Sequence, residues 1–210
     1  MEPALDIRSE MDAEAVVPPS VTDEDSVRAN AYGLLAALLA GPPHQKVFEL
    51  LASIDSSSDD GLGTAWRELG RAAERADVAA VDDEYHDLFI GVGRGELIPY
   101  GSWYQTGFVM DKPLAVLRSD LAALGFERQD DVKEPEDHAA ALLETMALIT
   151  GSPEHGIDVQ RRFFDRHLAA WMRTFFADLQ TAGSARFYRA VGQFGDQFMA
   201  FETKYLSLVT

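Results

Sequence analysis

The sequence contains no cysteine among its 210 residues. This absence excludes disulfide bonds, thiolate metal ligands and thiol catalysis. Long apolar runs are also missing, because the longest one, from Leu34 to Ala40, is far shorter than the roughly 20 residues that span a membrane. The start of the chain lacks the basic and apolar regions of an export signal. We therefore expect a cytoplasmic protein with no membrane insertion.

Positive charge is scarce as well, since 18 Lys and Arg residues face 35 Asp and Glu residues and the formal net charge is −17. Proteins that bind nucleic acids need clustered Lys and Arg side chains to contact the phosphates. The composition therefore argues against a nucleic-acid partner. A cationic partner is the natural expectation, although an acidic surface can also serve only to keep a protein soluble.

Strand-like alternation of apolar and polar residues is not sustained anywhere, and apolar residues instead recur at helical spacing. With helix start and stop signals, this spacing predicts helices over residues 23–41, 44–52, 64–76, 78–89, 112–125, 135–150, 163–179 and 184–206. We predict an all-α, single-domain helical bundle over residues 23–210, with a long irregular loop between its central helices. Residues 1–22 are expected to form a mobile acidic arm. The helix over residues 163–179 carries the most regular apolar stripe and is expected at the centre.

The segment from Tyr85 to His138 interrupts the helical pattern with glycine-rich and aromatic sequence. Such a segment inside a helical protein lowers stability unless it has a function. The glycines between Gly91 and Gly95 form either a phosphate cradle or a helix exit that needs positive φ. The helix exit is favoured, because a dinucleotide fingerprint would need glycine in place of Glu96 and the Gly-Lys-Ser/Thr of a P-loop is missing.

Aromatic side chains crowd the middle of this segment, at Tyr100, Trp103, Tyr104 and Phe108. Exposed aromatic residues on a loop often contact a peptide or protein, because they offer a large rigid area with a polar handle. The alternative is a loop that folds back and fills the core of its own bundle. The residues themselves favour neither interpretation.

The segment closes with the sequence Glu134-Pro135-Glu136-Asp137-His138. Pro135 suits the first residue of a helix, which would place Asp137 and His138 in the first helical turn. There the carboxylates either cap free amide groups or face a groove.

Two sets of residues could be imagined as metal ligands: Asp82, Asp83 and His86, or Glu134, His138 and Glu144. Helical di-metal sites need paired Glu-x-x-His motifs, which the sequence lacks. Solvated charge is therefore the better explanation of both sets, and we expect neither a metal nor a cofactor.

Three motifs, in one order, resemble the TorD/DmsD family of cytoplasmic chaperones. They are Tyr85-x-x-Leu88-Phe89-x-Gly91, Pro99-Tyr100-Gly101-Ser102-Trp103-Tyr104 and Glu134-Pro135-x-Asp137-His138. The later sequence Phe164-x-x-His167-Leu168-x-x-Trp171 also looks like the C-terminal helix of that family. The resemblance covers residues 23–206, and its most specific part is the Glu-Pro-x-Asp-His motif. It departs from the family at Val92, where a proline is usual.

The resemblance implies a chaperone, not an enzyme, that binds the twin-arginine signal peptide of a molybdopterin-dependent oxidoreductase. It would hold the apo-form of that oxidoreductase in the cytoplasm until the cofactor is inserted, and so delay export. Some members of the family are associated with weak guanine-nucleotide binding, and both a monomer and a dimer are compatible with it. The alternative function is a nucleotide- or metal-dependent hydrolase that uses the Gly91–Gly95 segment and His86 or His138.

The residues predicted to form the signal-peptide site are Tyr85, Leu88, Phe89, Tyr100, Gly101, Ser102, Trp103, Glu134, Glu136, Asp137 and His138. A twin-arginine leader combines two guanidinium groups with an apolar stretch, so its receptor needs carboxylates beside an apolar surface. We expect Asp137, with Glu134 or Glu136, to pair with an arginine, while His138 orients the carboxylate or bonds the peptide backbone.

The apolar part of the leader is expected to contact Tyr100, Trp103 and Leu88, with the other residues supporting them. On this interpretation, replacing Asp137 by alanine weakens leader binding with little change in thermal stability.

Overall fold

The computed structural model describes residues 21–54, 58–127 and 134–208, so all but the last two residues of the predicted arm over 1–22 lie outside the described residues. Within those ranges the chain forms helices and no strand, which confirms the predicted all-α, single-domain bundle. The elements are α1 (Asp23–Ala40), α2 (Gln45–Ser53), α3 (Gly61–Glu74), α4 (Val78–Tyr85), the π-helical segment η1 (His86–Ile90), α5 (Gly101–Thr106), α6 (Lys112–Ala123), α7 (Ala139–Thr150), α8 (Ile157–His167), α9 (Met172–Thr181) and α10 (Phe187–Leu208).

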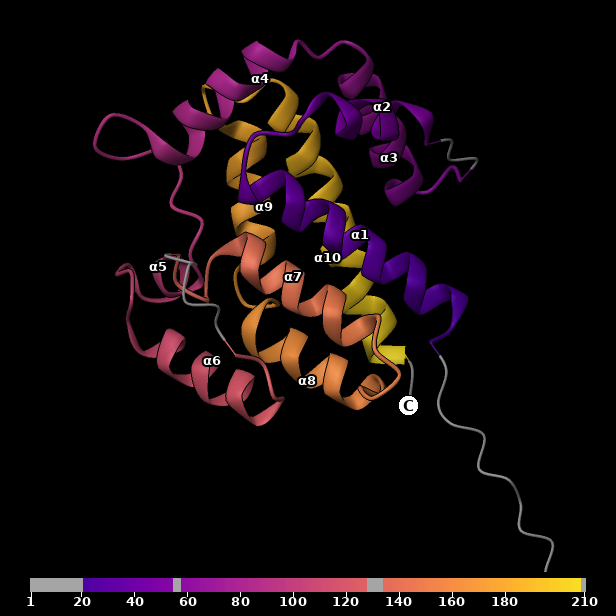
Figure 1. Cartoon of the computed structure of the whole chain (residues 1–210), viewed down its shortest axis with the longest axis vertical. Helices are drawn as coiled ribbons and strands as arrows, with labels where there is room; N and C mark the ends of the chain where they lie inside the picture. The colour runs from indigo at the N-terminus through magenta and orange to yellow at the C-terminus, as the bar shows by residue number, and fades with distance from the viewer. Residues whose placement is uncertain (1–20, 55–57, 128–133, 209–210) are drawn as a thin grey trace, which may run out of the picture.

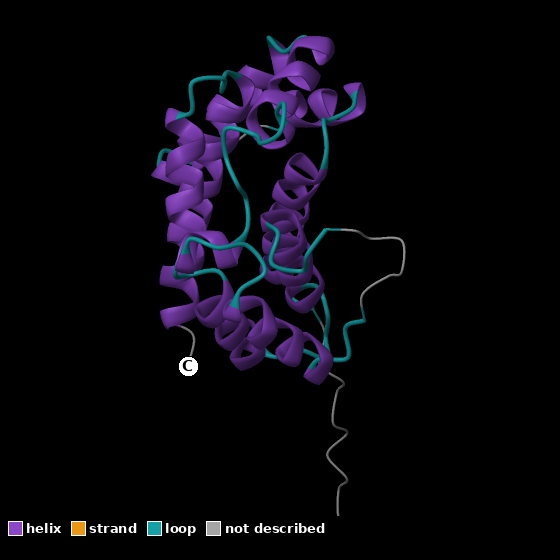
Figure 2. Ribbon diagram, turned by 90° about the vertical axis from the view of Figure 1, so that its left-hand side faces the viewer, coloured by secondary structure: helices purple, strands orange, loops and turns teal. Residues whose placement is uncertain are grey.

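The bundle is built around two helix pairs that lie side by side, α1 with α7 and α9 with α10 (Figure 1). Helices α2, α3 and α4 cover one end of the molecule, and α6 and α8 lie at the other end. The irregular segment after η1 runs along the bundle and connects the first group of helices with α5 and α6 (Figure 2). This crossing segment, residues 91–100, therefore joins the two ends of the molecule.

The start of α1 follows its local sequence. The Thr22 side chain accepts a hydrogen bond from the Asp25 amide (3.0 Å), and three acidic residues occupy the first turn. A hydroxyl cap followed by carboxylates satisfies free amides and suits the positive end of the helix dipole. The helix start predicted at this point is confirmed.

A buried ionic network ties α1 to α10. The guanidinium of Arg28, 2% exposed, donates to both carboxylate oxygens of Glu202, 0% exposed, over 2.8 Å and 2.7 Å. The Tyr32 hydroxyl donates to the same carboxylate (2.8 Å), and Arg28 also donates to Gln160 on α8 (2.8 Å). Because both charges are removed from water, each depends on the other for compensation.

The stripe over residues 163–179 does not form the single helix that the sequence predicts. The chain breaks between α8 and α9, and the backbone of Trp171 adopts φ −144°, outside the helical region. The indole of Trp171 donates to the carbonyl of His167 (2.8 Å), while Trp171 and Leu168 are both buried. The prediction of one continuous helix is wrong, because the stripe is divided between α8 at one end of the molecule and α9 beside α10 (Figure 1).

Candidate functional site

The crossing segment and the start of α7 meet through their backbones. The Gly101 amide donates to the Asp137 carbonyl (2.9 Å), and the Ala139 amide donates to the Pro99 carbonyl (2.8 Å). Tyr100 and His138 thus form an isolated antiparallel bridge. Two parts of the sequence that are about 40 residues apart are held together at this point, which is the meeting that the motif pattern predicts.

The same contacts move the start of α7. The sequence predicts Pro135 as the first helical residue, but the helix begins at Ala139 and His138 is its N-cap. The imidazole Nδ1 of His138 accepts a hydrogen bond from the Ala140 amide (3.2 Å). The predicted placement of Asp137 and His138 in the first turn is wrong, because the extended bridge to the crossing segment replaces that turn.

Asp137 is almost completely buried, with 2% of its surface exposed. Its Oδ2 accepts a hydrogen bond from the Ser102 amide (2.8 Å) in the first turn of α5. Its Oδ1 is also buried and has no hydrogen-bond partner among residues 21–54, 58–127 and 134–208. A buried polar atom without a partner loses its hydration and gains nothing in return, so it marks either a cost or a place for a ligand.

Asp137 also lines a pocket of about 380 Å³ between α5, α6, α7 and α8. The other lining residues are Gly101, Gln105, Thr106, Lys112, Pro113, Val116, Leu117, Leu142, Arg166 and His167. Most of the side chains on the α6 and α7 walls are apolar, and the polar groups lie mainly on α5 and α8. A pocket with an apolar wall and few polar groups is a common form of binding site.

The pocket ends on α8 at a buried histidine. His167 Nε2 lies 2.7 Å from Asp120 Oδ2, and Arg166 donates to the other oxygen of the same carboxylate (3.2 Å). Burial lowers the pKa of His167 although the Asp120 carboxylate opposes the change. Since Arg166 donates to Asp120, its guanidinium already has a carboxylate partner within the chain.

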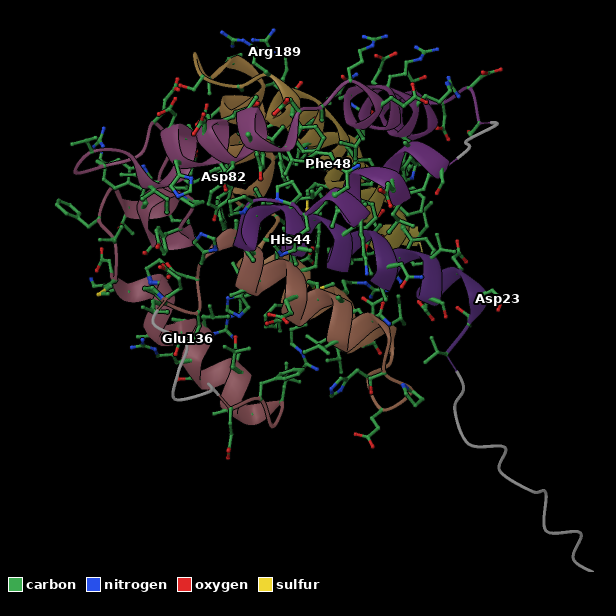
Figure 3. The ribbon with its side chains drawn as sticks, turned by 45° about the horizontal axis from the view of Figure 1, so that its top comes forward. Asp23, His44, Phe48, Asp82, Glu136 and Arg189 are labelled. Atoms are coloured by element: carbon green, nitrogen blue, oxygen red, sulfur yellow. The ribbon has the colours of Figure 1, made fainter. Side chains whose placement is uncertain are left out.

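The three acidic residues of the closing motif have different environments. Glu134 is exposed, and its carboxylate accepts a short hydrogen bond from the Tyr100 hydroxyl. Glu136 is paired with Arg118 of α6 at 2.9 Å and 3.0 Å, and its position beside that helix is visible in Figure 3. Glu134 is thus the solvent-exposed carboxylate of the three, while Asp137 is the buried one.

The aromatic residues from Tyr100 to Tyr104 differ in how they are buried. Tyr104 stacks on Trp171 with ring centroids 5.4 Å apart, which fills the bundle from within. Tyr100 and Trp103 remain half-buried, and the Tyr100 ring meets the His138 ring edge-on at 5.1 Å. Burial and the Glu134 carboxylate raise the pKa of Tyr100, so its hydroxyl stays a donor. Tyr104 thus packs into the core, whereas Tyr100 and Trp103 keep part of their surface exposed.

Two small residues at the start of α5 allow this helix to pack closely against the α8–α9 connection. Gly101 and Ser102 are both buried, and a Cβ at position 101 would lie 3.1 Å from Nε1 of Trp171. That distance is tighter than ordinary van der Waals contact, so a larger residue would push α5 away from the α8–α9 connection.

Tyr85 at the end of α4, and Leu88 and Phe89 in η1, directly precede the crossing segment. The Tyr85 hydroxyl donates to the Leu39 carbonyl (3.2 Å), and the Phe89 ring lies 5.4 Å from that of Tyr188. Leu88 is completely buried, so it has no surface on which a leader could bind in this conformation. These residues support the segment through the core, and the Leu97 amide bonds the Leu88 carbonyl (2.8 Å).

The glycines that follow η1 have the geometry of a helix exit. Gly91 and Gly93 adopt φ of 60° and 89°, and a Cβ at position 91 would overlap the Arg94 carbonyl. These conformations favour glycine for backbone reasons alone. The structure therefore accounts for both glycines without a phosphate group.

Sequence reasoning missed two features of this region. One is α5 itself, which the sequence presents as part of an irregular loop. The other is that Val109 and Met110 extend the exposed Phe108 into a row of apolar residues between α5 and α6. The signal that could have revealed this row is three consecutive apolar residues between Gly107 and a helix start at Asp111.

A second pocket, of about 820 Å³, lies where α3 and α4 meet the α9–α10 connection. Its acidic lining residues are Asp77, Asp83, Glu84 and Asp87. Glu84 is fully occupied within the chain, because its carboxylate caps α10 by accepting from the amides of residues 186, 187 and 188 at 2.7, 3.0 and 2.7 Å.

Neither imagined metal set forms a cluster: within the three described ranges, no group of three or more His, Asp or Glu side chains is placed to hold a metal ion. His86 instead lies with its Nδ1 2.8 Å from the backbone oxygen of Asp82. None of the helices in the described part of the chain is long and apolar enough to cross a membrane.

We expect acid to weaken the fold partly through His138. Burial lowers the pKa of this imidazole below its ordinary 6.5, so near neutral pH the unfolded chain binds the proton more readily than the folded one. The stability contributed by neutral His138 is therefore complete above pH 6.5 and is lost as the pH falls through that value toward the folded pKa. Urea unfolding of the wild type at pH 7.5 and at pH 5.5, one value above the ordinary pKa and one below it, measures this loss.

His138→Asn is the matched variant, because asparagine retains an N-cap acceptor and does not titrate. Its free energy of unfolding should depend less on pH than that of the wild type. Identical pH dependence in the two proteins would show that His138 does not contribute.

Comparisons with known proteins identify a family and several relatives. Residues 55–177 match the family described as nitrate reductase delta subunit. A protein named chaperone protein TorD from Vibrio atlanticus is 28% identical over 203 residues, covering 86% of this chain and 94% of that protein. A protein of the same name from Vibrio cholerae is 30% identical over 118 residues, covering 51% of this chain and 54% of that protein.

Solved structures with a similar fold include a maturation protein. A crystal structure described as a redox enzyme maturation protein from Archaeoglobus fulgidus superposes with a TM-score of 0.50 and 18% sequence identity. The superposition covers 84% of this chain and 94% of that one. The likeness extends to the arrangement of helices across almost the whole of that protein.

Proposed function

This chain belongs to the nitrate reductase delta subunit family, and on that premise we propose that it is a TorD-type chaperone that binds the twin-arginine signal peptide of a redox enzyme. The relatives named as chaperones support the general function. The proposal of signal-peptide binding depends on the bridge between Tyr100 and His138. This bridge brings aromatic side chains and carboxylates to a single place beside a pocket.

Two carboxylates are proposed to receive the arginines of the leader. Glu134 is exposed and already oriented by the Tyr100 hydroxyl, so an arginine can pair with it without unfolding anything. Asp137 has one buried oxygen with no donor among the residues that the structure describes, and it lines the pocket wall. A guanidinium can reach that oxygen after the lining side chains shift, and its apolar stem suits the Leu117 and Leu142 wall.

The two contacts differ in strength. An exposed ion pair such as one at Glu134 contributes only about 0.2–1 kcal/mol, because water screens both charges. A desolvated, charge-assisted hydrogen bond such as one at Asp137 reaches about 1.5–3 kcal/mol. Most of the affinity for a leader must therefore come from Asp137 and from apolar contacts, while Glu134 provides selectivity for arginine.

The client is proposed to be a molybdopterin-dependent oxidoreductase, held in its apo-form in the cytoplasm until the cofactor is inserted. Binding to the leader would cover the export signal and so delay transport. The alternative of a nucleotide hydrolase is less well supported, because the φ angles at Gly91 and Gly93 account for those glycines as a helix exit.

Isothermal titration calorimetry with a synthetic leader tests the function. We expect saturable binding to a peptide with two arginines and at least about tenfold weaker binding to the same peptide with two lysines, because a lysine cannot form the bidentate pair. Glu134→Gln should reduce the discrimination between the two peptides, by about two- to fivefold, since it removes one exposed partner.

Glu144→Gln serves as a matched control, because Glu144 is an exposed carboxylate on α7 outside the pocket lining. It should leave both affinities unchanged. Equal affinity of the wild-type protein for the two peptides, or no binding to either, would contradict the proposed function.

A further inference from the structure

Four exposed apolar residues lie beside the pocket that Asp137 lines. Phe108 is 71% exposed and Met110 is 69% exposed, with Val109 between them and Val116 on the adjoining face of α6. We call these four residues the apolar shelf. Exposed apolar side chains that gather on one surface, rather than scatter singly, mark a contact site.

The shelf has a defined backbone. Met110 adopts φ of 59°, a left-handed conformation that costs energy for a residue with a side chain. The Met110 amide donates to the Ser102 hydroxyl (3.1 Å), and the Thr106 hydroxyl bonds the backbone of Phe108 at both its amide and its carbonyl (3.3 Å each). These bonds hold the turn in a strained form whose side chains face solvent.

The shelf is continuous with the pocket. Thr106 and Lys112, which flank the turn on either side, both line the pocket, and Val116 belongs to the shelf and to the pocket wall. Ser102 links the two regions directly, since its amide bonds Asp137 and its hydroxyl bonds Met110. The shelf thus adjoins the side of the pocket that α5 and α6 form.

The charge of this surface is also distinct. In a chain with a formal net charge of −17, Asp111 and Lys112 are the only charged residues between Gly101 and Leu117, and they cancel. A neutral apolar surface suits an uncharged apolar segment, whereas cationic groups are attracted to the carboxylates beyond it.

We propose that the apolar shelf binds the apolar stretch of the leader, while Glu134 and Asp137 bind its arginines. This proposal rests on the proposed function and assigns its apolar contacts to four exposed residues that the sequence motifs do not include. The shelf residues then decide which leaders bind tightly, because apolar burial supplies more free energy than an exposed ion pair.

The test compares two proteins with two peptides. The double variant Phe108→Ser/Met110→Ser changes only exposed side chains, so it should fold like the wild type. We expect it to bind a twin-arginine leader at least about tenfold more weakly than the wild type, the loss expected from two apolar contacts. A second leader, with its apolar stretch replaced by serines and both arginines kept, should bind the two proteins equally.

The matched control is Val27→Ser/Leu148→Ser, which removes two exposed apolar residues from α1 and α7, away from the shelf. It should bind the leader like the wild type. The inference is overturned if the shelf variant binds the leader like the wild type while arginine remains preferred over lysine, an outcome that leaves the proposed function intact.

Sedimentation velocity on the same proteins identifies another occupant of the shelf. If the shelf variant changes the oligomeric state and leaves leader affinity unchanged, the shelf is an interface between copies of this chain and the inference fails. Absence of leader binding by the wild type would instead reject the proposed function itself.

Discussion

Replacing Glu202 by alanine should lower the free energy of unfolding by about 3–5 kcal/mol, one of the two largest effects expected in this protein. The variant leaves the Arg28 guanidinium buried without its main partner, since Arg28 is only 2% exposed. It also removes the acceptor of the Tyr32 hydroxyl on α1. Urea unfolding followed by circular dichroism measures the change.

The remaining partners of Arg28 do not replace this carboxylate. Asp25 and Gln160 each accept one hydrogen bond from Nη1 at 2.8 Å, while Nε and Nη2 donate to Glu202 and to no other described residue. Asp25 lies in the partly exposed first turn of α1. Its attraction is therefore weakened by water, and two buried donors of Arg28 remain unpaired in the variant.

A double variant distinguishes the cost of an unpaired charge from the loss of packing. Arg28→Met/Glu202→Leu replaces both charges by apolar side chains, and we expect it to recover most of the stability lost by Glu202→Ala. Lys204→Ala, an exposed change on the same helix, should have little effect. A loss below about 1 kcal/mol in Glu202→Ala would show that solvent enters the network and screens Arg28.

This network could not be predicted from the sequence, because Arg28 and Glu202 are 174 residues apart. No local sequence signal marks either residue as buried, because each is one of many charged side chains in its helix and in the protein. The cap at Thr22 shows the opposite case, since the hydroxyl and the amide it bonds are three residues apart. Signals within one turn of a helix are visible in sequence, whereas partners in other helices are not.

The sequence predicts the start of α7 and the path before α9 wrongly for the same reason. Pro135 carries a valid local signal for a helix start, yet the bond from the Ala139 amide to the Pro99 carbonyl delays that start by four residues. The stripe over residues 163–179 has helical spacing throughout, yet the burial of Trp171 interrupts it. In both places tertiary contacts outweigh a local preference.

The motifs predicted which segments meet better than they predicted how their side chains are buried. They predicted that the crossing segment and the Glu-Pro-x-Asp-His sequence belong together, and the bridge at Tyr100 joins them. They could not show that Asp137 is buried against Ser102, or that Leu88 is completely enclosed. Burial depends on every neighbour in space, so residue type alone does not reveal it.

Replacing Asp137 by asparagine should weaken leader binding by about 10- to 100-fold without destabilising the fold, if the unpaired oxygen receives an arginine. The amide oxygen of asparagine can still accept the hydrogen bond from the Ser102 amide, which lies 2.8 Å from the present Oδ2. The amide nitrogen would then occupy the position of Oδ1 and present a donor where the leader also presents one. Calorimetry with the twin-arginine leader measures the affinity, and urea unfolding measures the stability.

Asp137→Ala should behave differently, because it removes both oxygens. The Ser102 amide loses its acceptor at the start of α5, so we expect the free energy of unfolding to fall by about 1–2 kcal/mol together with leader binding. The burial of Asp137 thus replaces the expectation from sequence that this variant leaves thermal stability almost unchanged. Normal leader binding by Asp137→Asn, together with the stability loss in Asp137→Ala, would restrict Asp137 to a structural role and leave Glu134 as the proposed partner of the arginines.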